Sequence, residues 1–471
     1  MKRKLIRDKM TNPSFVEGNS EKQFNRRISF VVLVGLFFIW GFIISMNDIL
    51  IPYLKVVFKL SYFQAMLIQF SFFGSFFIGS LFYFLFSVKV GDPISKIGYR
   101  NGMSIGLFVA GLGCSLFYPA TVFNSYGFFL GALFCLGLGI TLLQIAANPY
   151  AALLGKEGTA SSRLNLAQGV NSLGTVIGPL LGGYLIFIYF FKAEHTIASS
   201  VKIPYLIFAS IFILLAIVVK ITPFPEFHKK DPPEIGFGVF KYPQLIMGVL
   251  AIFMAVGAEV ATGSLLINFF SLNDIAGLNA SQGSKFVAFY WGGLMVGRFL
   301  GATYFSGMKG TRKNLLTATV ILIALMVIAS TYGLRITGIS AFLMLLNLVA
   351  FRIGRSLPGR TMGVFSLNII ILLLIALFTK GQVAMWSVIG IGLFASIMWS
   401  NIFSLAIRGL GNYTSQGSSL LIMAILGAAI VPPIQGLIAD TFGIQNSFIV
   451  IICCHVFVAW YGFIGHKRMK N

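Results

Sequence analysis

Amide and hydroxyl side chains recur at helical spacing inside three long apolar runs of the sequence. The three sets are Gly41, Ser45, Asp48 and Pro52, then Gly137, Thr141, Gln144 and Asn148, then Gln168, Asn171 and Thr175. Each set keeps to one face of a helix, so each predicts a polar stripe on an apolar helix. A single amide in such a helix commonly serves helix packing. Three stripes together indicate a shared polar surface whose donors and acceptors suit a ligand rich in hydroxyl groups.

The later part of the chain offers counterparts of these stripes. Ser264 and Asn268 share one face of an apolar run, and Ser400 and Ser404 share one face of another. We expect amide side chains to contact the ligand. The predicted ligand-binding residues are Asn47, Gln144, Asn148, Gln168, Asn171 and Asn268.

Three charged residues lie within apolar runs, where a charge is costly and therefore indicates a function. Asp48 is a candidate for proton coupling, because a carboxylate inside a membrane can take up a proton on one side and release it on the other. The alternative is that Asp48 lies near the outer interface, capped by Asn47 or by water. Glu259 and Arg298 are candidates for a structural or coupling pair. Their heights differ by about 10 Å at 1.5 Å per residue, which argues against direct contact.

An enzyme acting on lipid-linked sugars is an alternative class of membrane protein. It would need clustered carboxylates, metal ligands or an activated nucleophile at the membrane face. The four His are scattered through the sequence, and the four Cys lie in apolar runs without CxxC spacing. We therefore expect no catalytic residue, no metal site and no bound cofactor.

The composition places the chain in a bilayer. Of its 471 residues 57% are hydrophobic and only 10% are charged, which is too little polar surface for a water-soluble fold. Apolar runs lie at about 29–54, 64–88, 103–120, 126–150, 164–191 and 203–221, then at 244–271, 283–306, 314–333, 338–351, 361–379, 382–407, 418–439 and 444–465. A span needs roughly 20 residues, so the run at 338–351, which adjoins Arg352, is short for one. The sequence predicts an all-α polytopic membrane protein with about 14 transmembrane helices. Twelve is the alternative, in which the weak pair at about 314–351 does not span.

Basic residues orient these helices. The chain carries 35 Lys and Arg against 13 Asp and Glu, and the basic residues gather in alternate loops rather than on one face. This pattern is typical of cytoplasmic loops and gives no indication of nucleic-acid binding. We expect a protein of the inner (plasma) membrane with both termini in the cytoplasm. The predicted parts are an N-terminal tail (1–28), a six-helix bundle (29–221), a central loop (222–243), a second bundle with the extra pair (244–465) and a C-terminal tail (466–471).

The two bundles repeat one another weakly. GITLLQIAANPYAALLG (139–155) aligns with ASIMWSNIFSLAIRGLG (395–411), and each is followed by a turn rich in Ser and Thr. Pro179 and Pro432 fall in the same order further on. Repeats of this kind build transporters in which the binding site lies between the halves, near the bilayer midplane.

Longer strings make the chain resemble a known family. WGFIISMNDILIP, LQIAANPYAALLG and ASSRLNLAQGVNSLGT are similar to the fucose/galactose/glucose:proton symporter family of the major facilitator superfamily. The resemblance implies two six-helix bundles and proton-coupled uptake of a monosaccharide by alternating access. It implies Asp48 as the functional carboxylate, and Gln168 and Asn171 as sugar-binding amides. The family also suggests a monomer whose partners are the sugar and the lipid bilayer.

Two departures shape the expected function. Gln144 stands where fucose permeases have a Glu, which favours a glucose or galactose substrate and weakens the case for a proton, leaving sodium open. Ser95 replaces an Asp of the superfamily's loop motif in GDPISKIGYR, so the resemblance does not carry the gating contacts of that Asp over to this chain. The alternatives are a fucose or N-acetylglucosamine permease, an uncoupled facilitator or a drug exporter of the same fold.

Overall fold

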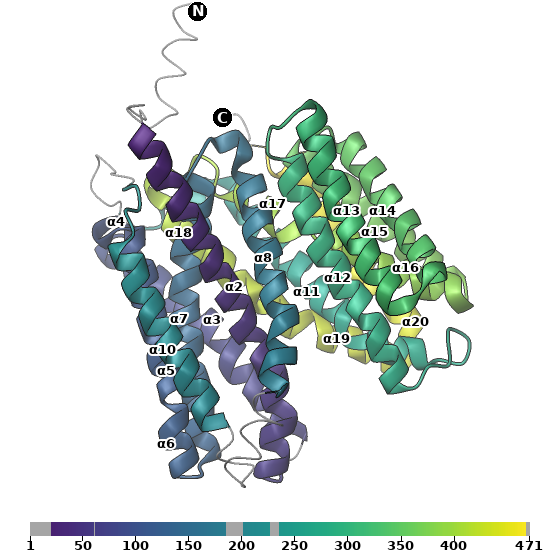
Figure 1. Ribbon diagram of the computed structural model, residues 1–471, viewed down its shortest axis with the longest axis horizontal. Coiled ribbons are helices and arrows are strands. Elements are labelled where there is room, and N and C mark those ends of the chain that lie inside the picture. Colours follow the sequence, from purple (N-terminus) through teal and green to yellow (C-terminus); the bar gives the residue numbers. More distant parts are fainter. Residues whose placement is uncertain (1–19, 61, 185–200, 227–234, 468–471) are drawn as a thin grey trace, which may run out of the picture.

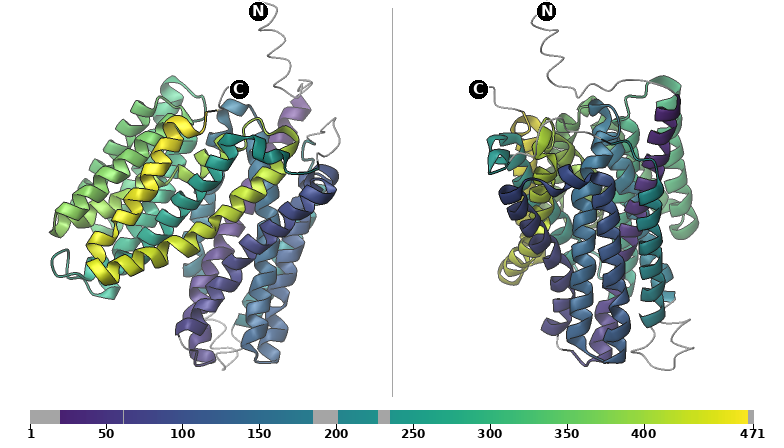
Figure 2. Two further views of the ribbon diagram at one scale, coloured as in Figure 1. Left: turned by 180° about the vertical axis from the view of Figure 1, so that it is seen from behind. Right: turned by 90° about the vertical axis from the view of Figure 1, so that its left-hand side faces the viewer.

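The computed structural model describes residues 20–60, 62–184, 201–226 and 235–467, and this part of the chain is helical without strands. Figures 1 and 2 show long helices running side by side, with the first part of the sequence on one side and the later part on the other. We call the described residues from 20 to 226 the N-terminal half and those from 235 to 467 the C-terminal half. The predicted all-α membrane fold is confirmed.

Among its described residues, the N-terminal half contains six long helices and three short ones. They are α2 (Ser20–Val57), α3 (Tyr62–Val90), α4 (Pro93–Ile97), α5 (Tyr99–Ser115), α6 (Phe117–Val122), α7 (Tyr126–Leu153), η1 (Glu157–Thr159), α8 (Ala160–Tyr184) and α10 (Lys202–Ile221).

In the described part of the chain the C-terminal half shows more helices than the N-terminal half, and several of them are separated only by short irregular turns. They are η4 (Gly238–Lys241), α11 (Pro243–Ser271), α12 (Ala280–Tyr304), α13 (Gly310–Tyr332), α14 (Leu334–Gly354), α15 (Pro358–Phe378), α16 (Gly381–Ala395), α17 (Met398–Ala406), η5 (Gly411–Tyr413), α18 (Thr414–Met423), η6 (Ala424–Leu426), α19 (Gly427–Phe442), α20 (Ile444–Ser447), α21 (Ile449–Trp460) and the π-helical η7 (Tyr461–Gly465).

Twelve helical segments of the described chain are long and apolar enough to span a membrane. Helices α8 and α12 are each 25 residues long and lie within the bundle, but they carry more polar side chains. They bring the long helices of the described chain to the fourteen expected. The predicted extra pair forms α13 and α14. No residue in the most apolar stretch of α13 is buried inside the protein, whereas 89% of the residues in the corresponding stretch of Gly381–Ala406 are buried. Helix α13 therefore lies at the edge of the bundle.

Glycines let pairs of helices approach closely in each half. A Cβ added to Gly174 of α8 would lie 2.2 Å from the carbonyl oxygen of Phe38 on α2. In the C-terminal half, a Cβ added to Gly427 of α19 would lie 2.1 Å from the carbonyl oxygen of Phe253 on α11. Backbones this close exclude larger residues and hold each half together. In the N-terminal half α2 packs against α8, and in the C-terminal half α11 packs against α19. These pairs occupy corresponding positions in the two halves, as an internal repeat requires.

Both ends of the described chain lie at the same end of the bundle, which we call the terminus-side end (Figure 1). The two halves lie together there and diverge toward the opposite, far end (Figure 2). Helix α8 packs against α12 and α17, and α18 packs against α3 and α7. These contacts make the terminus-side end the place where the halves are joined.

Candidate functional site

Helix α8 presents a polar edge to the C-terminal half. Its members follow one another at intervals of four, four, three and four residues, so they lie along one face of the helix and of η1, which leads into it. We call this set the α8 seam, and it comprises Glu157, Ser161, Asn165, Gln168 and Ser172. Apart from Glu157, the residues of the seam are buried.

Three residues of the α8 seam pair with one segment of the C-terminal half, around α17. The pairs, from the surface inward, are Glu157 with Arg408 (2.6 Å), Ser161 with Ser404 (2.7 Å) and Asn165 with Asn401 (3.1 Å). The Arg408 guanidinium donates to the carboxylate, and the Asn165 amide donates to the Asn401 oxygen. Successive residues one helical turn apart on each segment pair with one another, so the two segments are joined by a row of polar contacts.

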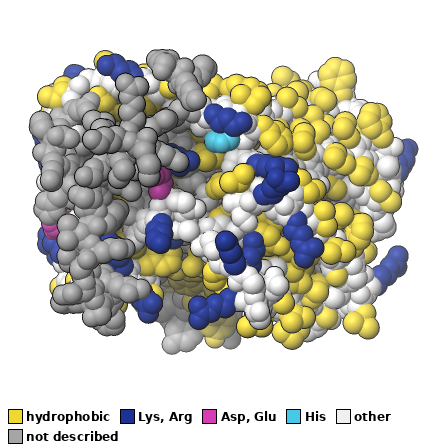
Figure 3. Space-filling model, turned by 90° about the horizontal axis from the view of Figure 1, so that it is seen from above, with side chains coloured by type: hydrophobic (Ala, Val, Ile, Leu, Met, Phe, Trp, Pro, Cys, Tyr) yellow, Lys and Arg dark blue, Asp and Glu magenta, His cyan; other side chains and the backbone are white. Residues whose placement is uncertain are grey.

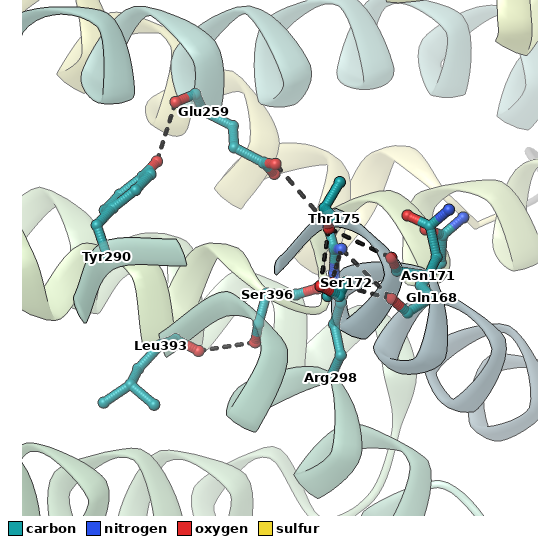
Figure 4. Close-up of polar contacts among 9 residues, drawn as sticks. All are labelled: Gln168, Asn171, Ser172, Thr175, Glu259, Tyr290, Arg298, Leu393 and Ser396. Atoms are coloured by element: carbon teal, nitrogen blue, oxygen red, sulfur yellow. Dashed lines mark hydrogen bonds and ion pairs between the residues drawn. The ribbon is translucent and has the colours of Figure 1, made fainter. Parts of the chain in front are cut away.

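Arg298 of α12 meets the inner part of the α8 seam (Figure 4). Its Nη1 donates to the hydroxyl of Ser172 and to the backbone oxygen of Gln168 at 3.5 Å, and its Nε donates to the backbone oxygen of Ser396 at 3.4 Å. Its Nη2 lies 3.8 Å from a carboxylate oxygen of Glu259 on α11. The guanidinium therefore contacts both halves at once.

The contact between Glu259 and Arg298 corrects our estimate from helix heights. Side chains lean toward the N-terminus of their own helix, and α11 and α12 run in opposite directions. Glu259 therefore leans toward the terminus-side end and Arg298 leans toward the far end, so each reaches for the other. Their exposed fractions are 18% and 13%, so the pair is largely withdrawn from solvent. Tyr290 donates to the backbone oxygen of Glu259 at 3.0 Å, which fixes that turn of α11.

Gln144 of α7 is fully buried, and neither atom of its amide has a hydrogen-bond partner among the described residues. Asn148, one turn along α7, donates to the backbone oxygen of Gln144 at 3.0 Å, while its own side-chain oxygen is unpartnered there. An orphaned buried polar group costs about 1–3 kcal/mol, so such groups commonly await a ligand or water. These two predicted residues therefore keep free hydrogen-bonding capacity.

The two predicted amides on α8 are used differently. Asn171 donates to the backbone oxygen of Phe37 at 2.8 Å and lies against Gly41, so it joins α8 to α2. The backbone oxygen of Gln168 accepts from Ser172 and from Arg298, and the residue as a whole is 6% exposed. Asn171 therefore has a packing role, and Gln168 lies at the junction of the halves.

The remaining predicted residues lie toward the far end. Asn47 and Asp48 belong to α2, but their side chains are outside the described part of the structure. Asn268 is exposed on α11, one turn from exposed Ser264. The predicted amides therefore do not all gather at one point, because Asn268 stands near the far end and Asn148 stands near the terminus-side end of its helix.

Several residues of this region were missed by the sequence analysis. Ser172 and Asn401 join the halves, and their signal was the regular polar spacing along α8 and α17. Gln435 of α19 is fully buried with both amide atoms unpartnered in the described structure, like Gln144. An amide beside two prolines in an apolar run was a signal of its own.

The loop between α3 and α5 uses an acid other than the one expected from the motif. The Asp92 carboxylate accepts from the backbone of Ile94 at 3.1 Å and from the Tyr83 hydroxyl, so it caps α4. Ser95 donates to the backbone oxygen of Asp92 at 2.7 Å. The loop is therefore ordered by Asp92, three residues before the position where Ser95 replaces the motif's Asp.

Comparison with known proteins identifies the fold family. The chain matches the sequence model of the Major Facilitator Superfamily over residues 31–366. The chain belongs to this superfamily. As a major facilitator it is a multi-pass membrane transporter and not an enzyme.

Individual relatives of this major facilitator have narrower names. It is 41% identical over 460 residues to the glucose/galactose transporter of Brucella abortus biovar 1, covering 97% of this chain and 98% of the relative. It is 31% identical to the L-fucose-proton symporter of Escherichia coli K12, covering 88% of each. A crystal structure of FucP in the outward conformation superposes with a TM-score of 0.74 at 27% identity, covering 94% of this chain and 100% of that one. The resemblance read from the sequence motifs is confirmed.

Proposed function

We propose that the chain takes up a monosaccharide, a hexose of the glucose or galactose type, by alternating access. The observation that carries the proposal is Gln144, which is buried between helices with both amide atoms unpartnered in the described residues. A sugar hydroxyl both donates and accepts, so it satisfies both ends of such a group. The names of the relatives with 41% and 37% identity, glucose/galactose transporter and putative glucose/galactose transporter, supply the substrate class.

We infer that the terminus-side end faces the cytoplasm of the inner membrane. Figure 3 looks onto this end and shows many basic and few acidic side chains on its visible surface. Exposed basic residues here are Lys96, Lys156, Lys309, Arg312, Arg355, Arg408 and Lys467. Lys and Arg are retained in cytoplasmic loops, which supports this orientation. With the halves joined at this end, the conformation is closed to the cytoplasm.

We assign proton coupling to Asp48, with sodium as the alternative ion. The assignment rests on the match of NDILIP to the symporter family and on the presence of a carboxylate within α2. Gln144 has no proton to exchange at neutral pH, so coupling through the pair of acids expected in fucose permeases is unavailable. The proposed unit is a monomer.

Uptake into cells that lack their own permeases tests this function. Radiolabelled glucose, galactose, fucose and N-acetylglucosamine are compared with and without a protonophore, for the native chain and for Asp48→Asn. We expect accumulation of glucose or galactose that the protonophore abolishes. In Asp48→Asn accumulation should be lost while downhill exchange of the same sugar survives.

The other outcomes are equally informative. Uptake that neither the protonophore nor Asp48→Asn changes would show that the protein is a facilitator without proton coupling. Uptake driven by a sodium gradient would show that sodium, not the proton, is the coupling ion. Uptake of fucose or N-acetylglucosamine alone would change the substrate, and transport of none of the four sugars would refute the proposal.

A further inference from the structure

The most unusual group in the described membrane region is the guanidinium of Arg298. It has acceptors on both halves of the protein, at Ser172 and Gln168 on α8 and at Ser396 in its own half. It also has a countercharge in its own half, at Glu259. A charge inside a membrane protein needs a partner in every state that it visits. The partners on α8 exist only while the terminus-side end is closed.

We propose that Glu259 and Arg298 form a switch that decides which end of the transporter is open. With the terminus-side end closed, α8 and Glu259 share the guanidinium. When the halves separate there, Arg298 leaves Ser172 and Gln168 and is held by the Glu259 carboxylate. Both residues are positioning residues, since they act through the contact between the halves.

The geometry explains why the two partners act in opposite directions. The contacts of Arg298 with Ser172 and Gln168 cross between the halves, so they stabilise only the closed terminus-side end. The 3.8 Å separation from Glu259 is longer than a hydrogen bond, so the carboxylate is an incomplete partner in the closed state. It becomes the main partner once α8 has moved away. Loss of the carboxylate therefore costs more in the open state than in the closed one.

The switch differs from the outer contacts of the α8 seam. Glu157 and Arg408 keep 55% and 64% of their side chains exposed, so water and salt replace their contact easily. Only 13% of the Arg298 side chain is exposed, so in the closed state its partners are the protein groups rather than water. The contacts of Arg298 should therefore contribute more than the surface ion pair to the free-energy difference between the closed and open terminus-side end.

Hydrogen–deuterium exchange of the full chain in lipid nanodiscs, without sugar, tests the switch. Exchange of the segments 157–172 and 400–416 reports how often the terminus-side end opens. A hydrogen bond to a charged group is strong enough to change such a ratio about tenfold. We expect Ser172→Ala to speed exchange about tenfold in both segments. Glu259→Gln should slow it by a similar factor, and Glu259→Asp should slow it less.

Two control variants separate the switch from general damage. Thr175→Ala removes a hydroxyl one turn from Ser172 that, within the described structure, bonds to the backbone of its own helix. Asp274→Asn breaks an exposed ion pair with Lys380 within the C-terminal half. Neither should change exchange in the two segments. Changes of the same sign for Ser172→Ala and Glu259→Gln, or equal changes in the controls, would overturn the switch. The test uses no substrate, so failure of the sugar proposal leaves it standing.

Discussion

Replacing Gln144 with methionine should stabilise the protein and weaken sugar binding in the same variant. Methionine has nearly the volume of glutamine but no amide. In the described structure the amide of Gln144 makes no hydrogen bond, and its side chain is fully buried. The sugar-free protein therefore bears the cost of burying two unpaired polar groups, and Gln144→Met removes that cost.

The two effects can be sized from hydrogen-bond energies. Each orphaned group costs about 1–3 kcal/mol, and partial hydration brings the expected gain in unfolding free energy to about 1–2 kcal/mol. If the amide makes one or two hydrogen bonds to a sugar hydroxyl, their loss weakens binding by about 1–3 kcal/mol, which is a factor of roughly 5 to 150 in Kd. Thermal unfolding in detergent, with and without sugar, measures both quantities on one sample.

Asn347 provides the matched control for Gln144. Its buried amide nitrogen donates to the backbone oxygen of Leu393 at 3.1 Å, within the C-terminal half, while its amide oxygen has no partner in the described residues. Asn347→Leu loses one hydrogen bond and removes one unpaired oxygen, so it should stabilise the protein less than Gln144→Met does and leave the stabilisation by sugar unchanged. A Gln144→Met protein that is less stable than the native one, and that still binds sugar with native affinity, would show that Gln144 is a packing residue.

Two further predictions concern packing and the surface ion pair. Gly427→Ala places a Cβ 2.1 Å from the backbone of Phe253, so it should destabilise the C-terminal half by about 1–3 kcal/mol in thermal unfolding, whereas Gly436→Ala meets nothing within 4 Å and should be neutral. Glu157→Gln breaks the exposed pair with Arg408, so it should speed hydrogen exchange of the α8 seam less than fivefold, and the effect should vanish in high salt. A salt-independent effect, or equal effects of the two alanines, would contradict these sizes.

The fold could be predicted from the sequence because membrane spans are recorded in composition. The runs at 314–333 and 338–351 correspond to α13 and α14, although the second run was short and adjoined Arg352. The structure extends α14 back to Leu334 through Arg335 and polar residues that the apolar count left out. Composition locates such helices well and their ends poorly.

The site could be predicted only in part, because the sequence of one helix does not show which group on a neighbouring helix its amide side chains will bond to. Asn171 and Gln144 had the same kind of stripe around them. Asn171 turned out to bond to a backbone oxygen of α2, beside Gly41, whereas Gln144 met no partner in the described residues. The ion pair of Glu259 and Arg298 was missed because Cα heights ignore the direction in which long side chains lean.

The chemistry of the two kinds of helix contact explains how the chain can be both rigid and mobile. Glycine contacts such as Gly174 with α2 bring backbones together without groups that could bond to water, so opening them gains nothing in return. The α8 seam is built from hydroxyls, amides and charges, and most of these can exchange a protein partner for water at little net cost. The halves therefore move as units, and the joint between them is free to open. Arg298 is the exception within that joint, because a largely buried guanidinium is costly without a countercharge. In the proposed switch, the Glu259 carboxylate of its own half supplies that countercharge.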